Sequence, residues 1–411
     1  MKFGYDQSLT LKPQNFKPSK CHYFSLLIVI LLILSFYFFS IVNLQKKKGI
    51  SFIAYHYPLG TINLPILIEF NFTNPFLQKF DYFHNYQYCE NCLFQPSLKG
   101  NSKNNDVILS LLVGNLYGLT LSIKTLRTVG CRASLIIFTN NITYLSIRHH
   151  LKGARLQHLM GNCGVSFIII SKIPQNFRCY DFIRIYSYYQ FLAIRKHLID
   201  RVLMFDIYDT IFQGDPFSDD IDFDGIGFTQ DSILLEKDAG PFGYQSFFHT
   251  ILNYKYDPII HGKQNMINSG VVFGRATHIV SFLENLFFPP LLPYLTNTSQ
   301  IINSWQWFDQ GYLNVIMWSD WFPNKKDKFV FFQENNSFIS IYHLKEEKLN
   351  CSELGKITVI NSKYPARLIH QYDRKPGIVE KVQKKCFGKL DTNKTFIRKV
   401  VLLEHRMFHW N

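Results

Sequence analysis

The stretch RVLMFDIYDTIFQGDPF, residues 201–217, holds the residues of this chain whose types and spacing best suit chemistry. An apolar run ends in two carboxylates, Asp206 and Asp209, and a turn formed by Gly214, Asp215 and Pro216 follows. Carboxylates at the end of a strand can coordinate a hard divalent cation, and a bound cation can in turn neutralise a diphosphate. One of them could instead serve as the nucleophile of a phosphatase. The pair alone does not decide between these two chemistries.

Two later segments offer groups that could bind hydroxyls. MINSGVVFG places Asn268 immediately before a predicted strand, and the glycine that follows allows a close backbone approach. FDQGYLNVI places Asp309 and Gln310 at the start of a predicted helix. There the two side chains can orient sugar hydroxyls, or Asp309 can serve as the N-cap of the helix.

A third segment, HQYDRKP, could complete a cation site. It supplies His370, a ligand type that combines with two carboxylates on manganese. It also supplies Arg374 and Lys375, cations that suit a departing diphosphate.

A sheet is needed to bring these residues together, and the sequence predicts one. The run DVILSLLV (106–113) is unbroken and apolar, as in a strand covered on both faces, and a helix with apolar residues at helical spacing follows it. SLIIFT and VSFIII predict two more strands, and YDFIRIYSYYQFLAIRKHLID predicts a helix that leads into RVLMFD. This alternation predicts an α/β fold with a mostly parallel sheet, whose ligands bind beyond the carboxyl ends of the strands.

The order of these motifs resembles a known family. A strand-end acidic motif, then NSG, then DQxxLN, then a histidine followed by KP is similar to glycosyltransferases of the GT-A fold. The glycogenin-like and galactosyltransferase enzymes of family 8 are the most similar, and the resemblance covers roughly Asp106 to Gly377. It implies a Rossmann-like nucleotide-diphospho-sugar transferase domain that transfers a hexosyl group to a glycan or glycoconjugate acceptor.

The resemblance also implies roles for individual residues. The implied ligands of Mn²⁺ (or Mg²⁺), which would hold the donor diphosphate, are Asp206, Asp209 and His370. The implied donor-binding residues are Arg184, Asn268, Arg374 and Lys375. The implied catalytic residues, facing the donor sugar or the acceptor, are Asp309 and Gln310.

Two departures from the family pattern stand out. DIYD is a DxxD motif where the family has DxD, and Asp209 matches the second acid of that motif better than Asp206 matches the first. The C-terminal motif is one residue shorter than HxxGxxKP and has Asp373 near the expected glycine. A divergent family with the same fold therefore remains open, and retention of anomeric configuration does not follow.

Two other functions remain open. FDIYDT also resembles the first motif of haloacid-dehalogenase phosphatases, in which Asp206 would be the nucleophile. That motif sits on the first strand of its domain, whereas here about 100 residues of αβ pattern precede it, and no later pair of aspartates at a strand end completes the metal site. The third alternative is a catalytically inactive membrane protein on a GT-A scaffold.

The segment FSLLIVILLILSFYFFSIV, residues 24–42, contains no charge and is long enough to span a hydrocarbon core of ~30 Å. No small-residue cleavage pattern follows it, which favours an uncleaved signal anchor. The predicted organisation is a cytoplasmic tail (1–23), an anchor (24–42), a stem or N-terminal lobe (43–105) and a GT-A domain (106–411). The expectation is a single-pass type II protein of the Golgi or endoplasmic reticulum.

The residues beyond the anchor suit a luminal compartment. Six N-glycosylation sequons lie there, at Asn71, Asn141, Asn297, Asn335, Asn350 and Asn393. Seven cysteines lie there too, an odd number that leaves at least one without an intramolecular partner. Cys89 and Cys92 form an isolated CENC, for which disulfides are a better interpretation than zinc. The net charge of +14 is spread along the chain without a basic block, so nucleic acid is not an expected partner.

Overall fold

The structure, a computed structural model, describes residues 66–71, most of 86–149, 159–172, 180–234, 264–286, 308–318 and most of 329–387. The chain divides into two units, 1–61 and 62–411, and every described residue belongs to the second. The expected membrane anchor, residues 24–42, lies outside the described residues. Within the part of the chain that is described, no helix combines the length and the apolar character needed to cross a bilayer.

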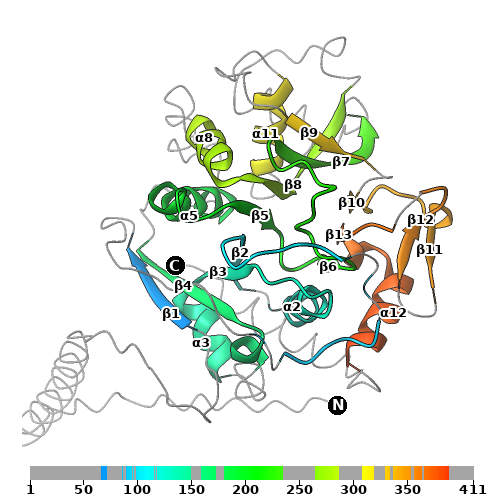
Figure 1. Ribbon diagram of the computed structural model, residues 1–411, viewed down its shortest axis with the longest axis horizontal. Coiled ribbons are helices and arrows are strands. Elements are labelled where there is room, and N and C mark those ends of the chain that lie inside the picture. Colours follow the sequence, from blue (N-terminus) through cyan, green and yellow to red (C-terminus); the bar gives the residue numbers. More distant parts are fainter. Residues whose placement is uncertain are drawn as a thin grey trace, which may run out of the picture. The chain divides into compact units, whose positions relative to one another are not determined.

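A mixed, mostly parallel β-sheet forms the centre of the second unit (Figure 1). Its strand order is β1-β4-β3-β2-β5-β8-β7-β9, so β1 is an edge strand next to β4. β8 is antiparallel to both of its neighbours, and the other neighbouring pairs are parallel. The strands are β1 (Ile66–Asn71), β2 (Val107–Leu112), β3 (Ser134–Asn140), β4 (Val165–Lys172), β5 (Arg201–Phe205), β7 (Ile226–Leu234), β8 (Asn265–Arg275) and β9 (Phe329–Phe332).

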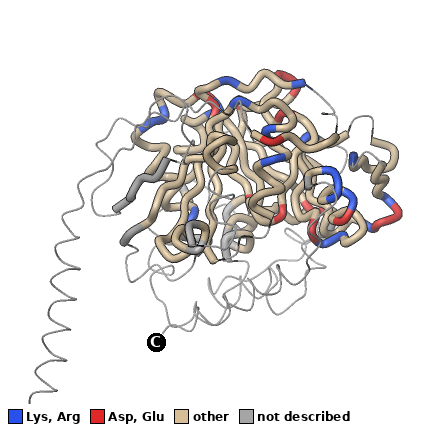
Figure 2. Tube along the Cα trace, turned by 90° about the horizontal axis from the view of Figure 1, so that it is seen from below, with Lys and Arg blue, Asp and Glu red and all other residues tan. Residues whose placement is uncertain are grey.

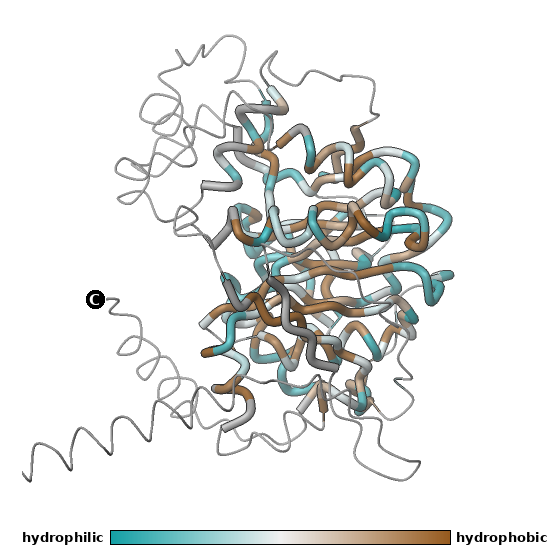
Figure 3. Tube along the Cα trace, turned by 90° about the vertical axis from the view of Figure 1, so that its left-hand side faces the viewer, coloured by the Kyte–Doolittle hydropathy of each residue, from teal (hydrophilic) through white to brown (hydrophobic). Residues whose placement is uncertain are grey.

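Helices cover both faces of the sheet, as the unbroken apolar strands predict. Val107, Leu109 and Leu111 of β2 belong to one core, and Ile108 and Leu112 belong to another. The first core includes residues of α5 (Tyr180–Arg195), α8 (Ala276–Leu286) and α11 (Phe308–Trp318), and the second includes residues of α2 (Leu119–Thr128) and α3 (Asn141–His149). Figure 3 shows the apolar strands between these layers. The expected α/β class, with a mostly parallel sheet, is confirmed.

A small sheet adjoins the carboxyl end of β5. It has the order β10-β13-β6, in which β13 is parallel to β10 and antiparallel to β6. Its strands are β10 (Phe338–Ser340), β13 (Leu368–His370) and β6 (Thr210–Phe212). The 3₁₀ helices η2 (Glu346–Lys348) and η3 (Tyr372–Arg374), the pair β11 (Leu349–Cys351) and β12 (Ile357–Val359), and the helix α12 (Pro376–Phe387) complete this part. Figure 2 shows acidic and basic residues interspersed along the described chain.

Both cysteines of the CENC motif form disulfides, as the sequence predicts. Cys89 pairs with Cys163 next to β4, and Cys92 pairs with Cys386 in α12. A hydrogen bond from Leu93 N to Lys385 O (2.8 Å) runs beside the second disulfide. The motif therefore joins two distant parts of the chain, and neither cysteine serves a metal.

Two further described cysteines, Cys131 and Cys351, are free thiols. Burial raises the pKa of Cys131 well above its ordinary value, and burial also raises the pKa of the half-buried Cys351. We expect iodoacetamide at about pH 8 to modify Cys351 slowly and to leave Cys131 unmodified until the protein unfolds, because the thiolate is the reacting species. Peptide mass spectrometry of the native and urea-unfolded chain measures this. Equal labelling of both thiols in the native state would contradict the expectation.

Candidate metal centre

The loop 206–209 between β5 and β6 carries both predicted acids. Asp206 directly follows β5, and its N–H donates to the carbonyl oxygen of Gly270 on β8 (2.9 Å). The Ser122 hydroxyl of α2 lies against the carbonyl oxygens of Ile207 (2.8 Å) and Thr210. These contacts hold the loop at both ends, so the two carboxylates project from fixed backbone positions.

Tyr208 explains how a DxxD loop fits at this strand end. Its hydroxyl accepts a hydrogen bond from the N–H of Val113 (2.7 Å) and donates one to the carbonyl oxygen of Val113 (3.0 Å), just after β2. Gly118, at φ 72°, lies so close that a Cβ there would overlap the Tyr208 carbonyl group. The loop is therefore anchored between the ends of β2 and β5.

Replacing Tyr208 by Phe is expected to lower the free energy of unfolding by about 1 kcal/mol, because the Val113 N–H and C=O groups lose this partner. Urea unfolding measures the change. Tyr342→Phe is a matched control, because that ring is exposed and should give a change near zero. A Tyr208→Phe variant as stable as the control would contradict the anchoring role.

His370 reaches the same place from the far end of the chain. It is the last residue of β13, and strand register puts it between Ser340 of β10 and Thr210 of β6. Its Nε2 lies 3.2 Å from Asp209 Oδ1 and 3.7 Å from Asp206 Oδ2. One potential ligand atom from each of Asp206, Asp209 and His370 lies within 4.8 Å of the other two. The structure thus brings the three expected metal ligands together.

Gly270 makes this meeting possible. A Cβ built on Gly270 would overlap Cε1 and Nε2 of His370 and would lie 2.9 Å from Asn268 Oδ1. The imidazole is only 2% exposed, so it has little room to move. Absence of a side chain at position 270 is therefore a condition for the histidine to reach the acids.

A proton on the imidazole balances the charges of the centre. Burial disfavours a charged imidazole, but Asp209 and Asp206 outweigh this and raise the pKa of His370 to about 10. Burial also opposes ionisation of Asp206, but Arg184 and His370 lower the pKa of that carboxyl. Two carboxylates therefore face one arginine and an imidazole that holds a proton. A divalent ion could take the place of that proton.

The donor atoms fit such an ion. Asp209 Oδ1 and both ring nitrogens of His370 are buried and have no hydrogen-bond partner of good geometry. Buried polar atoms are seldom left in this state unless an ion or water serves them. Two carboxylates and one imidazole are ligands that Mn²⁺ accepts, and Mg²⁺ accepts the carboxylates.

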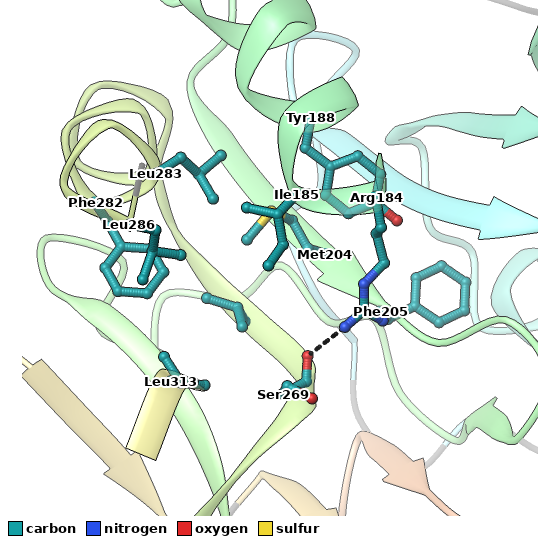
Figure 4. A pocket seen from close by; sticks show the side chains of 11 residues that line it. Arg184, Ile185, Tyr188, Met204, Phe205, Ser269, Phe282, Leu283, Leu286 and Leu313 are labelled. Carbon is teal, nitrogen blue, oxygen red and sulfur yellow. Dashed lines mark hydrogen bonds between the residues drawn. The ribbon is translucent and has the colours of Figure 1, made fainter. Parts of the chain in front are cut away.

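Arg184 contacts the centre from α5. It forms an ion pair with Asp206, and its Nη2 lies 3.5 Å from the carbonyl oxygen of Ser269 (Figure 4). An apolar pocket lies beside it, between α5, α8, β5 and β8. The pocket offers few polar groups and does not suit a diphosphate, whereas the acidic centre with a cation does.

Asn268 belongs to a buried polar network next to the centre. It lies within β8, a correction to the expectation that it precedes the strand, because β8 already begins at Asn265. Its amide lies 3.3 Å from both carboxylate oxygens of Asp231 on β7 and 3.4 Å from Gln371 Oε1. Its own Oδ1 accepts from the N–H of Gly270 (2.8 Å). The Ser340 hydroxyl donates to Gln371 Oε1 (2.7 Å), which joins the network to the small sheet.

The remaining candidates lie on α11 and at the end of η3. Gln310 is buried in α11, and its amide contacts Met266 Sδ on β8 (3.2 Å). Asp309 lies in the first turn of α11, and its side chain is outside the described part. Arg374 is exposed and pairs with Asp373 (3.3 Å), and the half-buried Lys375 lies where η3 gives way to α12.

The centre lies at a point where the strand order of the sheet reverses. From β2 the chain proceeds to β3 and β4 on one side and then to β5 on the other side of β2. The carboxyl ends of β2 and β5 therefore flank a topological switch point, the usual ligand position in open α/β sheets. Asp206 follows β5 there, and Val113 follows β2.

A comparison of the sequence with protein-family models gives no match, and a search of curated proteins gives none either.

Several residues of this site were not predicted from sequence motifs. Asp231, Gln371 and Ser340 carry the polar network, and only the acid within the strand-like run IGFTQDS offered a signal. The sequence predicted no role for Tyr208. Its role depends on the position of β2, which the local sequence does not indicate.

Proposed function

We propose that the described domain is a cation-dependent glycosyltransferase of the GT-A type. It moves a hexosyl group from a nucleotide-diphosphate donor, a UDP-sugar, to a hydroxyl of a glycan, glycoprotein or glycolipid. The observation that carries the proposal is that potential ligand atoms of Asp206, Asp209 and His370 lie within 4.8 Å of one another at the carboxyl end of β5. Their position at the switch point supports a nucleotide as the ligand.

In the proposed reaction Asp206, Asp209 and His370 would hold Mn²⁺, and the bound ion would supply positive charge to offset the negative charge on the leaving diphosphate. Arg184 keeps Asp206 ionised and oriented through their ion pair. The bond from the anomeric carbon to the diphosphate oxygen breaks, and the electron pair stays on that oxygen. The acceptor hydroxyl oxygen forms the new glycosidic bond, and its proton is released, so the products are a glycoside, a nucleoside diphosphate and a proton.

The compartment forms part of the same proposal. The protein is a single-pass type II membrane protein with its catalytic domain in the lumen of the Golgi or endoplasmic reticulum. The disulfides Cys89–Cys163 and Cys92–Cys386 support an oxidising compartment. Two of the sequon residues, Asn141 and Asn350, are exposed in the described part, which suits glycosylation.

The experiment is to incubate the purified full chain with a panel of nucleotide sugars and Mn²⁺, with and without excess chelator. Release of a nucleoside diphosphate from one UDP-sugar, lost in chelator, supports the proposal. Phosphate release from p-nitrophenyl phosphate, without cleavage of any nucleotide sugar, would indicate a phosphatase that uses Asp206. Neither activity, together with no binding of Mn²⁺, would indicate a scaffold without catalysis.

A further inference from the structure

The structure exposes an aromatic ring two residues after Ser340, the register partner of His370. The large hydrophobic side chains exposed in the described part are Leu93, Ile142, Leu145, Ile194, Leu198, Tyr342 and Ile360, and Tyr342 is the aromatic one among them. It is 42% exposed in a chain whose described phenylalanines are largely buried. Part of this ring is therefore accessible to a ligand.

Polar side chains surround this ring. The ring of His343 lies with its centroid 4.4 Å from that of Tyr342, and the guanidinium of Arg374 lies 5.9 Å from the Tyr342 centroid. His343 is partly exposed, and its Nε2 lies 4.0 Å from Asp231 Oδ2. We call Tyr342, His343 and Arg374 the Tyr342 platform. Arg374 lies over one face of the ring, and the His343 ring meets it at an angle of 63°.

The Tyr342 platform is connected to the metal centre through the small sheet. Ser340 and His370 are register partners, and the N–H of Ile341 donates to the carbonyl oxygen of His370 (3.1 Å). Tyr342 follows Ile341 directly, and Arg374 lies at the end of η3, whose Tyr372 N–H donates to the carbonyl oxygen of Asp209 (3.3 Å). The platform and the ligands therefore share one rigid support.

The strand order indicates on which side of β5 the Tyr342 platform lies. The switch point lies between β2 and β5, and β8 and then β7 follow on the other side of β5. Through His343 the platform adjoins Asp231 on β7, so it lies on the side away from β2. A nucleotide bound with its diphosphate at the metal centre and its nucleoside toward β2 would leave this side for the sugar and its acceptor.

We propose that the Tyr342 platform binds the acceptor, and that this acceptor is a pyranoside. The inference rests on the proposed function and adds the acceptor class to it. The C–H face of a pyranose stacks on the exposed part of the Tyr342 ring, and His343 hydrogen-bonds one of its hydroxyl groups. The arrangement predicts that Tyr342 contributes to acceptor binding and leaves donor binding unchanged.

The test compares the full chain with Tyr342→Ala, Tyr342→Phe and the control Ile360→Ala, an exposed apolar residue just beyond β12. The UDP-sugar that the wild type hydrolyses fastest is the donor, and p-nitrophenyl β-galactoside, β-glucoside and β-N-acetylglucosaminide are the acceptor probes. Tyr342→Ala should raise the acceptor KM about tenfold while donor hydrolysis stays within about twofold. Tyr342→Phe, which keeps the ring, and Ile360→Ala should match the wild type.

Three results would overturn the inference. These are an unchanged acceptor KM in Tyr342→Ala, a parallel fall of hydrolysis and transfer in that variant, and a wild type that hydrolyses its donor but uses none of the three glycosides. A wild type that cleaves no nucleotide sugar and binds no Mn²⁺ would instead refute the proposed function. The two failures are therefore distinguishable.

Discussion

Asp209→Asn is expected to lower Mn²⁺ affinity at least about 100-fold and to bring nucleotide-sugar turnover below detection. Asp209 Oδ1 is a buried oxygen 3.2 Å from His370 Nε2, so the substitution removes a charged ligand from the middle of the centre. Loss of a residue that merely supports a metal ligand costs 10–100-fold in affinity or activity, so loss of a ligand itself should reach at least the upper end of this range. Isothermal titration with Mn²⁺ alone measures the affinity, and nucleoside diphosphate release measures turnover.

The matched control for Asp209→Asn is Asp224→Asn, the same change at an exposed carboxylate that pairs with Arg275. Exposed ion pairs contribute little to stability, so this control should behave as the wild type in both assays. We expect Asp209→Asn to remain folded, because Asp206 still lies beside His370. Thermal unfolding in the presence of chelator checks this. Wild-type Mn²⁺ affinity in a folded Asp209→Asn variant would refute the metal centre.

Gly270→Ala is expected to have nearly the same effect on metal binding without removing any ligand. The added Cβ would overlap the His370 ring, which must then move away from Asp209. The φ angle of Gly270 is not among the positive values in the structure, so the effect is steric and not a result of backbone strain. Overpacking of this kind costs about 1–3 kcal/mol of stability. We expect at least about a 100-fold loss of Mn²⁺ affinity, as for a ligand substitution.

Gly377→Ala is the control for Gly270→Ala. It lies in the first turn of α12, seven residues after His370, and a Cβ there meets nothing within 4 Å. Alanine favours a helix more than glycine does, so this variant should be as stable as the wild type or more stable, by up to about 1 kcal/mol. Its Mn²⁺ affinity should be unchanged. If Gly270→Ala also binds Mn²⁺ normally, His370 does not need the close approach seen here.

Local sequence patterns predicted the central part of the fold. The apolar runs at 106–113, 134–139 and 165–170 correspond to β2, β3 and β4, and the helix leading into RVLMFD corresponds to α5. A strand buried on both faces leaves an unbroken apolar run in the sequence, and a helix buried on one face leaves apolar residues at helical spacing. The disulfide interpretation of CENC was also correct, because a metal site would need further ligands nearby.

Several elements were not predicted, most of them short. The strands β6, β10 and β11 have three residues each, too few for a period to be recognised, and β1 and α12 were missed as well. The pairing partners of Cys89 and Cys92 were also open, because Cys163 and Cys386 are distant in the chain. The direction of β8 depends on how the chain returns to the sheet, and its residue types would suit either direction.

The candidate site was also predicted only in part from the sequence. Residue types and motif order were enough to select Asp206, Asp209 and His370 as a possible set, because ligand chemistry belongs to single side chains. Their proximity in space follows from the pairing of β13 with β6, the contact of Asp206 with Gly270, and the space that Gly270 leaves for the imidazole. These are contacts between segments far apart in the chain, formed when strands pair and cores pack. No local pattern encodes them, and the folded chain was needed to reveal them.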